Sequence, residues 1–512
     1  MIELTVAEIA EIVGGTLSDI DPVTAAATRV TGTVEFDSRA VTAGGLFLAL
    51  PGARVDGHDH AAPAIAAGAV AVLAARPVGV PAVIAAPVTG ESRSGALEHD
   101  RESAGAAVLA ALALLAAEVA RRLAGRGLRI IGVTGSSGKT STKDLLAAVL
   151  APLGSVVAPP GSFNNELGHP WTVLRATTDT DFLVLELSAR HPGNIAALAD
   201  IARPDIGVVL NVGTAHLGEF GSRQAIAETK GELAAAVPPG GAVVLNVDDP
   251  AVAAMAERAV ARVVRVSRSA RADADLWASD VVLDELARPR FTLRRADAPP
   301  VEVTLAVHGD HQVSNALCAA AVAFECGATG EQLATALAAA GPASARRMQV
   351  STRSDGVTVI NDAYNANPDS MAAGLKALAW MARQPDAGTP GGRRAVAVLG
   401  EMGELGDDAI TEHDRIGRLA VRLDVARLIV VGKGRSMGAM FNGAVMEGSW
   451  GSEAVGVDDA DTALELLRSE LRPGDVVLVK ASNAAGLGAL AEALVADPDT
   501  GFGDGMGEDD RK

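Results

Sequence analysis

The chain has 512 residues, of which 49% are hydrophobic and 21% charged, so it can fill the cores of about three domains. Its formal net charge of −19 disfavours nucleic acid and anionic membrane surfaces as the main partners. Two cysteines exclude a disulfide framework, and Met1–Ala10 lacks the cationic start of a signal peptide. The Ala-rich runs 61–75 and 103–117 are too short to span a bilayer. We therefore expect a cytoplasmic protein with no nucleic-acid partner and no stable membrane insertion. A monomer is a default expectation that no feature of the sequence determines.

Residues 1–103 are predicted to form a small α/β domain. Short apolar runs at Gly45–Leu50 and Ala69–Leu73 are typical of strands. The polar stretch Gly90–Ser103 predicts a surface loop, and the Ala/Leu-rich segment Ala104–Leu123 predicts a helix.

The most informative segment follows that helix. An apolar run, Leu128–Val133, leads into Gly135-Ser-Ser-Gly-Lys-Thr140 and then into the helix-prone segment Ser141–Leu150. Strand, glycine-rich turn and helix form the context of a phosphate-binding loop, in which backbone N–H groups surround the anion and Lys139 reaches the outer phosphates. Val133 stands where the usual pattern has its first glycine, so the loop is a shortened variant. The alternative, a chance glycine turn, conflicts with this context.

The same strand-and-helix alternation continues through residues 104–343. Apolar runs at Phe182–Leu185, Ile206–Leu210 and Ala242–Asn246 are separated by helical patterns, which predicts βαβ units and a mostly parallel sheet. Alternating apolar and polar residues within Val263–Val307 instead predict antiparallel strands added to that sheet.

A second α/β series occupies residues 344–496 and predicts a Rossmann-like domain. Its expected strands are Val357–Ile360, Ala395–Leu399, Leu428–Val431 and Val476–Val479. Helices are expected at Ser370–Ala382 and Asp461–Leu471. The Gly/Asp-rich stretch 497–512 is interpreted as a disordered acidic tail.

Three further residues in the central part could carry chemistry, because ligands bind at the carboxyl ends of parallel strands. Glu186 ends an apolar strand, where its carboxylate could hold Mg²⁺; the alternative is a solvated acid. His216 follows the strand at Ile206–Leu210, although a lone histidine is usually structural. Lys230 lies on a predicted helix, and a surface lysine is the alternative reading.

Taken together, these segments resemble the Mur ligase family, whose members build the peptide of the peptidoglycan precursor. The matching segments share short polar motifs that follow strands or open helices: Thr134-Gly-Ser-Ser-Gly-Lys-Thr, Asn164-Asn-Glu-Leu-Gly, Glu186-Leu-Ser, Asn211-Val-Gly-Thr-Ala-His-Leu, Glu228-Thr-Lys-Gly-Glu-Leu and His311-Gln-Val-Ser-Asn-Ala. The resemblance implies a three-domain architecture: a small uridine-binding domain, a central P-loop ATPase-like parallel sheet and a C-terminal Rossmann-like domain.

The resemblance also implies site residues for the cofactors ATP and Mg²⁺. The nucleotide contacts would come from Gly135, Ser136, Ser137, Gly138, Lys139, Thr140, Ser141, Asn315, Arg347 and Asp362. Thr140, Glu186 and His216 would serve Mg²⁺, with Lys230 as a further ligand if its amine carries a carbamate. Lys139, Lys230 and His216 would be catalytic. Because Arg347 and Asp362 belong to the C-terminal domain, ATP would be enclosed only when the domains close.

Within the family, two C-terminal motifs resemble the member that adds D-alanyl-D-alanine to UDP-MurNAc-tripeptide. These are Asn361-Asp-Ala-Tyr-Asn-Ala-Asn-Pro and Leu399-Gly-Glu-Met-Gly-Glu-Leu-Gly, with His413 downstream. The alternatives are the ligase that adds the third residue, whose Asp-Asn-Pro-Arg motif is absent, and a folylpolyglutamate synthase-like ligase. A non-catalytic P-loop module that senses nucleotides is a further alternative. Lys480-Ala-Ser-Asn departs from the family's Lys-Gly-Ser-Arg.

The N-terminal motifs resemble the uridine-binding module of the last two ligases of the pathway. They are Phe36-Asp-Ser-Arg, Gly45-Leu-Phe-Leu-Ala-Leu-Pro-Gly and Asp56-Gly-His. Ser38 and Arg39 are therefore candidates for the UDP end of the substrate, and Asn165 is a third candidate substrate residue. Arg39 could pair a phosphate, but a structural salt bridge is as consistent with the sequence.

Overall fold

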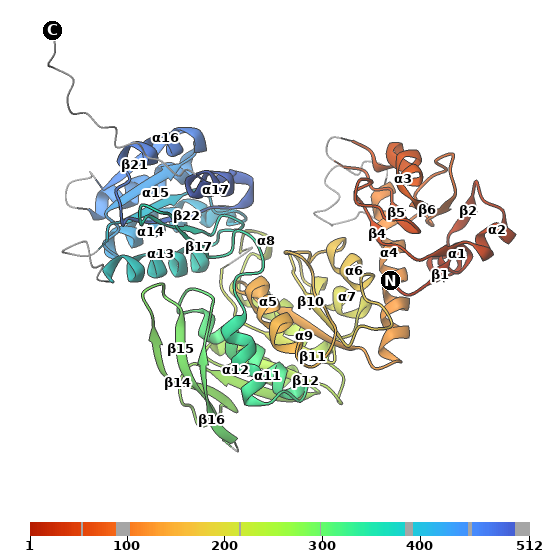
Figure 1. Ribbon diagram of the computed structural model, residues 1–512, viewed down its shortest axis with the longest axis horizontal. Helices are drawn as coiled ribbons and strands as arrows, with labels where there is room; N and C mark the ends of the chain where they lie inside the picture. The colour runs from red at the N-terminus through yellow and green to blue at the C-terminus, as the bar shows by residue number, and fades with distance from the viewer. Residues whose placement is uncertain are drawn as a thin grey trace, which may run out of the picture.

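The computed structural model describes residues 1–52, 55–88, 103–214, 217–296, 298–384, 393–448 and 453–496. They form three α/β units, and the central unit lies between the N-terminal and C-terminal units (Figure 1). The α/β fold class predicted from the sequence is confirmed. The predicted loop Gly90–Ser103, apart from Ser103, and the predicted tail 497–512 lie outside the described residues.

The N-terminal unit is built on a five-stranded sheet in the order β2-β7-β6-β5-β4, in which only β2 runs antiparallel to its neighbour. The strands are β2 (Thr16–Ser18), β4 (Val34–Glu35), β5 (Gly45–Leu48), β6 (Ala69–Ala74) and β7 (Ala82–Ile84). Two short strands, β1 (Leu4–Thr5) and β3 (Arg29–Val30), pair separately. The helices are α1 (Val6–Val13), α2 (Pro22–Ala27) and α3 (Ala61–Ala67).

Helix α4 (Ala104–Ala124) connects this unit to the central one (Figure 1). The helix predicted over Ala104–Leu123 is confirmed, and Glu118 pairs with Arg121 and Arg122, one turn further on, at 2.7 Å each. Its 21 residues are long and apolar enough to cross a bilayer by length and composition, but 61% of its most apolar window is buried inside the protein. Its apolar side chains pack in the same core as α1 and α7 (Asn194–Ile201).

The central unit contains a nine-stranded sheet in the order β16-β15-β14-β13-β12-β11-β8-β10-β9. Its strands are β8 (Arg129–Thr134), β9 (Val156–Val157), β10 (Phe182–Glu186), β11 (Ile206–Val209), β12 (Ala242–Asn246), β13 (Arg262–Ser267), β14 (Leu276–Leu283), β15 (Pro289–Arg295) and β16 (Ala298–Thr304). The parallel strands predicted at β8, β10, β11 and β12 are confirmed. The antiparallel prediction for 263–307 holds for β14–β16 but is wrong for β13, which pairs parallel to β12. A crossover through α10 (Pro250–Ala253) returns the chain to the same edge.

Helices cover both faces of this sheet, and α5 (Lys139–Leu150) packs against α11 (Gln312–Glu325) on one of them. The remaining helices are α6 (Gly168–Val173), α8 (Leu217–Phe220), α9 (Arg223–Ala236) and α12 (Gly330–Ala339). The hairpin between β14 and β15 reaches towards the C-terminal unit (Figure 1). Its residue Ala287 is fully buried in that unit's core, and Trp380 Nε1 donates to Asp284 O at 2.8 Å.

The C-terminal unit has a six-stranded sheet in the order β17-β18-β22-β19-β20-β21, with only β17 antiparallel. The strands are β17 (Gln349–Thr352), β18 (Thr358–Asn361), β19 (Ala395–Leu399), β20 (Arg427–Val431), β21 (Ala454–Val457) and β22 (Val476–Lys480). The helices are α13 (Pro368–Arg383), α14 (Ala409–Arg422), α15 (Arg435–Glu447), α16 (Ala460–Glu470) and α17 (Leu487–Ala496). All four predicted strands are present, whereas β17 and β21 were not predicted.

Candidate active site

The glycine-rich turn after β8 forms the floor of the candidate site. Helix α5 begins at Lys139 with no side-chain cap, so its first N–H groups are available to an anion. Gly138 has a φ of +83°, and a Cβ there would come within 2.7 Å of Asn315 Oδ1, so this position requires glycine. The turn thus has the conformation of a phosphate-binding loop.

Neighbouring residues hold this turn in place. Asn211, directly after β11, accepts from Ser137 N at 3.0 Å and donates its side-chain N–H to Ser137 O at 3.1 Å. Ser136 Oγ accepts from Gly213 N at 2.9 Å. Lys139 Nζ donates to Gly135 O at 2.6 Å, so its ammonium group lies over the loop. Burial lowers the pKa of Lys139, while Glu186 opposes that shift.

Glu186 is fully buried at the end of β10, which excludes the alternative of a solvated strand-end acid. One carboxylate oxygen accepts from Thr140 Oγ1 at 3.3 Å, Ser162 Oγ at 3.4 Å and Asn164 Nδ2 at 3.3 Å. The other, Oε1, is buried without a hydrogen-bond partner in the described chain. Burial raises the pKa of Glu186, and Lys139 opposes the shift. A hard cation would satisfy the orphaned oxygen, so Glu186 and Thr140 fit Mg²⁺.

Lys230 lies on α9 and is only 3% exposed, which excludes the alternative of a surface lysine. It makes no hydrogen bond or ion pair within the described part of the chain. Burial lowers its pKa well below the ordinary lysine value, and the charge of Lys139 lowers it further. The neutral form of an amine is the one that reacts with carbon dioxide, and a lowered pKa favours that form. His216, another predicted metal-site residue, lies outside the described residues. The other predicted metal ligands are all described.

Two adjoining clefts lie above the loop, with volumes of about 560 and 460 Å³. Ser137, Gly138, Ser141 and Arg347 line both of them. The second cleft also contains Asn315 and Asp362. Every predicted nucleotide residue except Gly135 lines one or both of the clefts, which lie at the carboxyl ends of the parallel strands.

Arg347 joins the C-terminal unit to the phosphate-binding loop. Its guanidinium stacks on Tyr364, 4.4 Å from the ring centroid, and one N–H reaches Thr140 Oγ1 at 3.4 Å. Because Tyr364 belongs to the C-terminal unit and Thr140 to the central unit, the clefts are completed only when the two units approach each other.

Asp362 has a structural partner that sequence reasoning missed. Its Oδ2 accepts from Lys480 Nζ at 2.6 Å, and its Oδ1 accepts from Met348 N at 3.0 Å. Lys480 is 1% exposed, and burial lowers its pKa while Asp362 opposes the shift. The motif Lys480-Ala-Ser-Asn marks Lys480 in the sequence, but no local pattern pairs it with Asp362, 118 residues away.

The predicted substrate residues of the N-terminal unit lie elsewhere. Arg39 forms a bidentate pair with Asp37 at 2.9 and 2.7 Å, and its side chain is 87% exposed. The structural salt bridge that the sequence left open is therefore present, and neither Arg39 nor the half-buried Ser38 lines the two clefts. Asn165 does line the first cleft, and its Oδ1 accepts from Gly168 N at 2.9 Å at the start of α6.

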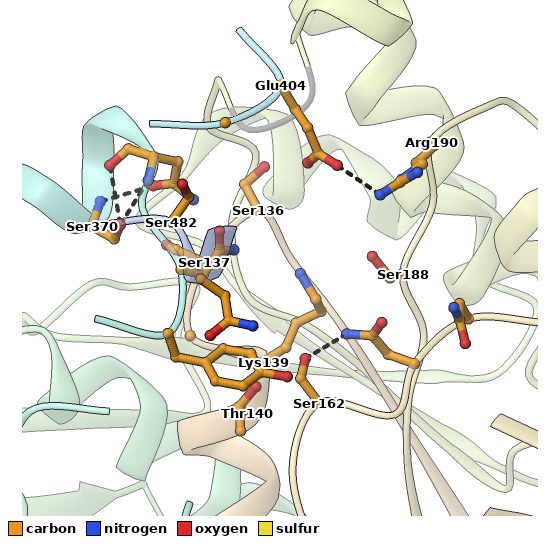
Figure 2. A pocket seen from close by; sticks show the side chains of 18 of the residues that line it. Ser136, Ser137, Lys139, Thr140, Ser162, Ser188, Arg190, Ser370, Glu404 and Ser482 are labelled. Carbon is orange, nitrogen blue, oxygen red and sulfur yellow. Dashed lines mark hydrogen bonds and ion pairs between the residues drawn. The ribbon is translucent and has the colours of Figure 1, made fainter. Parts of the chain in front are cut away.

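An ion pair that sequence reasoning also missed crosses the first cleft (Figure 2). Arg190, in the loop after β10, meets Glu404 of the C-terminal unit at 2.8 Å. With Lys139, Arg347 and the uncapped helix, the cleft can bind a polyanion and bring a second charged substrate beside it. This is the chemistry of a nucleotide-dependent group transfer.

Three family descriptions match the chain. Residues 32–118 match the "Mur ligase family, catalytic domain", residues 133–323 match the "Mur ligase middle domain", and residues 346–483 match the "Mur ligase, glutamate ligase domain". Together they account for most of the sequence and for all three units of the fold.

Comparisons with individual proteins agree with these family matches. The chain is 71% identical to the UDP-N-acetylmuramoyl-tripeptide–D-alanyl-D-alanine ligase of Mycobacterium tuberculosis, over 98% of this chain and 99% of that protein. Its fold is similar to that of a crystal structure of MurF from Acinetobacter baumannii, with a TM-score of 0.79, 27% identity and coverage of 96% and 99%. MurF from Thermotoga maritima in complex with ADP gives a TM-score of 0.71 and 28% identity, covering 92% of this chain and 98% of that one.

Proposed function

This chain belongs to the Mur ligase family, and we propose that it is the ATP-dependent ligase that joins D-alanyl-D-alanine to UDP-MurNAc-tripeptide. The observation that carries the choice of substrates is the 71% identity to the M. tuberculosis enzyme along the whole chain. The ADP complex of the T. maritima relative supports the use of ATP.

A carboxylate is a poor acyl donor at neutral pH, so the tripeptide's terminal carboxylate must first be activated. Its oxygen attacks the γ-phosphorus of ATP, the bond to the bridging oxygen breaks, and ADP leaves behind an acyl phosphate. We assign the phosphates to the uncapped start of α5, to Lys139 and to Arg347, which supply positive charge as the phosphoryl group moves.

Thr140 and Glu186 would hold Mg²⁺, since a buried carboxylate oxygen without a partner lies beside the hydroxyl of the phosphate-binding loop. When bound there, the cation would neutralise charge on the transferring phosphoryl group. Lys230, as a carbamate, would add a second anionic group nearby.

In the second half-reaction, the ammonium group of D-alanyl-D-alanine first loses a proton to solvent. The neutral amine then attacks the acyl carbon and gives up a second proton as the amide forms. A tetrahedral intermediate collapses, the new amide bond remains, and inorganic phosphate leaves with the C–O electron pair. Asn315 and Asp362 would keep the nucleoside in the second cleft throughout, while Asn165 lines the first cleft where the peptide ends meet.

Phosphate release tests this proposal directly. Purified enzyme with ATP and Mg²⁺ should release phosphate only when both UDP-MurNAc-tripeptide and D-alanyl-D-alanine are present. Turnover with UDP-MurNAc-dipeptide and a single amino acid would instead identify the ligase that adds the third residue, and turnover with a folate and glutamate would identify a folylpolyglutamate synthase. ATP binding without any ligation would identify a nucleotide-sensing module.

The proposal also includes a cytoplasmic location and a monomeric state.

A further inference from the structure

The ion pair across the first cleft joins two units of the fold in front of the phosphate-binding loop. Arg190 and Glu404 lie on the far side of the cleft from Thr140 and Ser162, and Ser188 lies below them (Figure 2). The two side chains are 44% and 34% exposed, so they are open to the cleft rather than fixed in a core.

The positions of both residues are fixed by their surroundings. The backbone N–H of Arg190 donates to Asn194 Oδ1 at 3.1 Å. The segment before Glu404 is held because Met402 N donates to His413 Nε2 at 3.0 Å. Glu404 itself has a φ of +63°, a conformation that non-glycine residues rarely adopt and that often marks a functional position.

The charges that line the cleft divide by position. Among its described lining residues, the cations are Lys139, Arg347 and Arg190. Lys139 lies on the phosphate-binding loop and Arg347 contacts Thr140, so both face the nucleotide phosphates. Arg190 instead faces two carboxylates, Glu404 at 2.8 Å and Glu219 at 3.9 Å. Glu404 is also close enough to Lys139 to raise the pKa of that lysine. The pair therefore lies beside the place where the γ-phosphate would lie.

An acceptor dipeptide carries opposite charges at its two ends. We propose that Arg190 and Glu404 form the binding site for this zwitterion, with Arg190 pairing the carboxylate and Glu404 the ammonium group of the incoming dipeptide. The ligand replaces the contact between Arg190 and Glu404 by one contact to each of them, and Glu219 stays beside the arginine. This inference rests on the proposed function, because it takes D-alanyl-D-alanine as the acceptor.

Steady-state kinetics with Arg190→Ala tests the assignment. Loss of a hydrogen bond to a charged group costs about 1.5–3 kcal/mol, so we expect the KM for D-alanyl-D-alanine to rise by about 10- to 150-fold. The KM values for ATP and UDP-MurNAc-tripeptide should stay within about threefold of wild type. Glu404→Gln should raise the KM for the dipeptide while hydroxylamine still traps the acyl phosphate at the wild-type rate.

The decisive comparison uses D-alanyl-D-alaninamide, which lacks the carboxylate. Wild type should prefer the dipeptide strongly, Arg190→Lys should keep part of that preference, and Arg190→Ala should lose it. Arg422→Ala is the matched control, because Arg422 pairs with Glu447 between α14 and α15 and neither residue lines the cleft. This variant should behave as wild type.

The outcomes separate the two proposals. If Arg190→Ala slows the dipeptide and the amide equally, the pair only holds the two units together and the binding site is wrong. If wild type ignores D-alanyl-D-alanine altogether, the proposed function fails. A wild-type KM for the dipeptide in Arg190→Ala would also show that the proposed binding site is wrong, while the proposed function would stand.

Discussion

Lys230 and Lys480 are both buried lysines beside the clefts, but they differ in their partners. Lys480 has the carboxylate of Asp362, whereas Lys230 has neither a hydrogen bond nor an ion pair in the described chain. A neutral buried amine can attack carbon dioxide and release a proton, which leaves a carbamate. The carbamate that the family resemblance implies at Lys230 stays a prediction, and the burial of Lys230 without a partner in the described chain is what supports it.

Substitution of Lys230 tests that interpretation. Lys230→Ala should abolish ligation, and acetate should restore part of the rate by supplying a carboxylate. Lys230→Arg should be as inactive as Lys230→Ala, since a guanidinium cannot become an anionic ligand. Near-normal activity of Lys230→Arg in the same phosphate-release measurement would show that only a positive charge is needed there.

Asp362 is expected to act on stability as well as on the nucleotide. Asp362→Ala leaves the buried ammonium of Lys480 without its partner, which costs about 3–5 kcal/mol. Thermal unfolding without nucleotide should therefore shift to lower temperature, and Asp362→Asn should shift it less because Met348 N keeps an acceptor. An unchanged unfolding midpoint in Asp362→Ala would show that the pair contributes nothing. Nucleotide affinity should fall in the same variant.

His169, on α6, should make the protein sensitive to acid. It is fully buried, and burial lowers its pKa to about 4. In the unfolded chain His169 takes up a proton near the ordinary histidine pKa, whereas in the folded chain it does not. The free energy of unfolding therefore has its full value above about pH 6.5. It declines by about 3 kcal/mol as the pH falls to about 4. Urea unfolding across this range should show a shallower decline in His169→Gln than in wild type, and equal slopes would contradict the assignment.

At the scale of elements, the features that could be predicted from the sequence are those that a local residue pattern determines. The strands β12 and β19 match the predicted ranges, and the turn before α5 was recognised from its glycines and its lysine. β21 was missed because Ala454-Val-Gly-Val is short and contains glycine, and β13 was assigned the wrong direction because orientation depends on the crossover. The pairs Arg190–Glu404 and Lys480–Asp362 join distant segments, so no local pattern could reveal them.

Helix α8 of the central unit contacts the turn that starts at Gly406 in the C-terminal unit. Adding one methyl group at this contact tests whether the two units must come together for ligation. Gly218 lies so close to this turn that a Cβ on it would meet Gly406 N at 2.5 Å and Gly406 Cα at 2.6 Å. Gly218→Ala should therefore force the central and C-terminal units apart. Overpacking typically costs about 1–3 kcal/mol, so we expect ligation to slow by about 5- to 150-fold.

Gly240→Ala is the matched control, because a Cβ there meets nothing within 4 Å. It should leave the rate unchanged. Each variant should unfold at nearly the wild-type temperature, since Gly218 belongs to an interface and not to a core. Normal ligation by Gly218→Ala would mean that this contact is absent when the enzyme works.

At the scale of the whole molecule, the linker between α12 and β17 is held at one point. Ser344 Oγ accepts from the buried Lys143 Nζ at 3.2 Å, and Ser344 N donates to Asp144 Oδ2 at 3.0 Å. Beyond this anchor the two units meet through Arg347 and Thr140, through Arg190 and Glu404, and through the β14–β15 hairpin. A rotation about Ser344 would break the contacts between side chains and open both clefts.

Substrates should therefore compact the enzyme. The nucleotide supplies negative charge between Lys139 and Arg347, which lie on opposite units, so its binding favours the closed arrangement seen here. Small-angle scattering should show a lower radius of gyration after ATP and UDP-MurNAc-tripeptide are added together. Lys139→Ala, which weakens the grip on the phosphates, should show little change under the same conditions. If the free enzyme already has the radius of gyration of this structure and substrates do not alter it, closure is not linked to nucleotide binding, and Arg347 belongs to a preformed site.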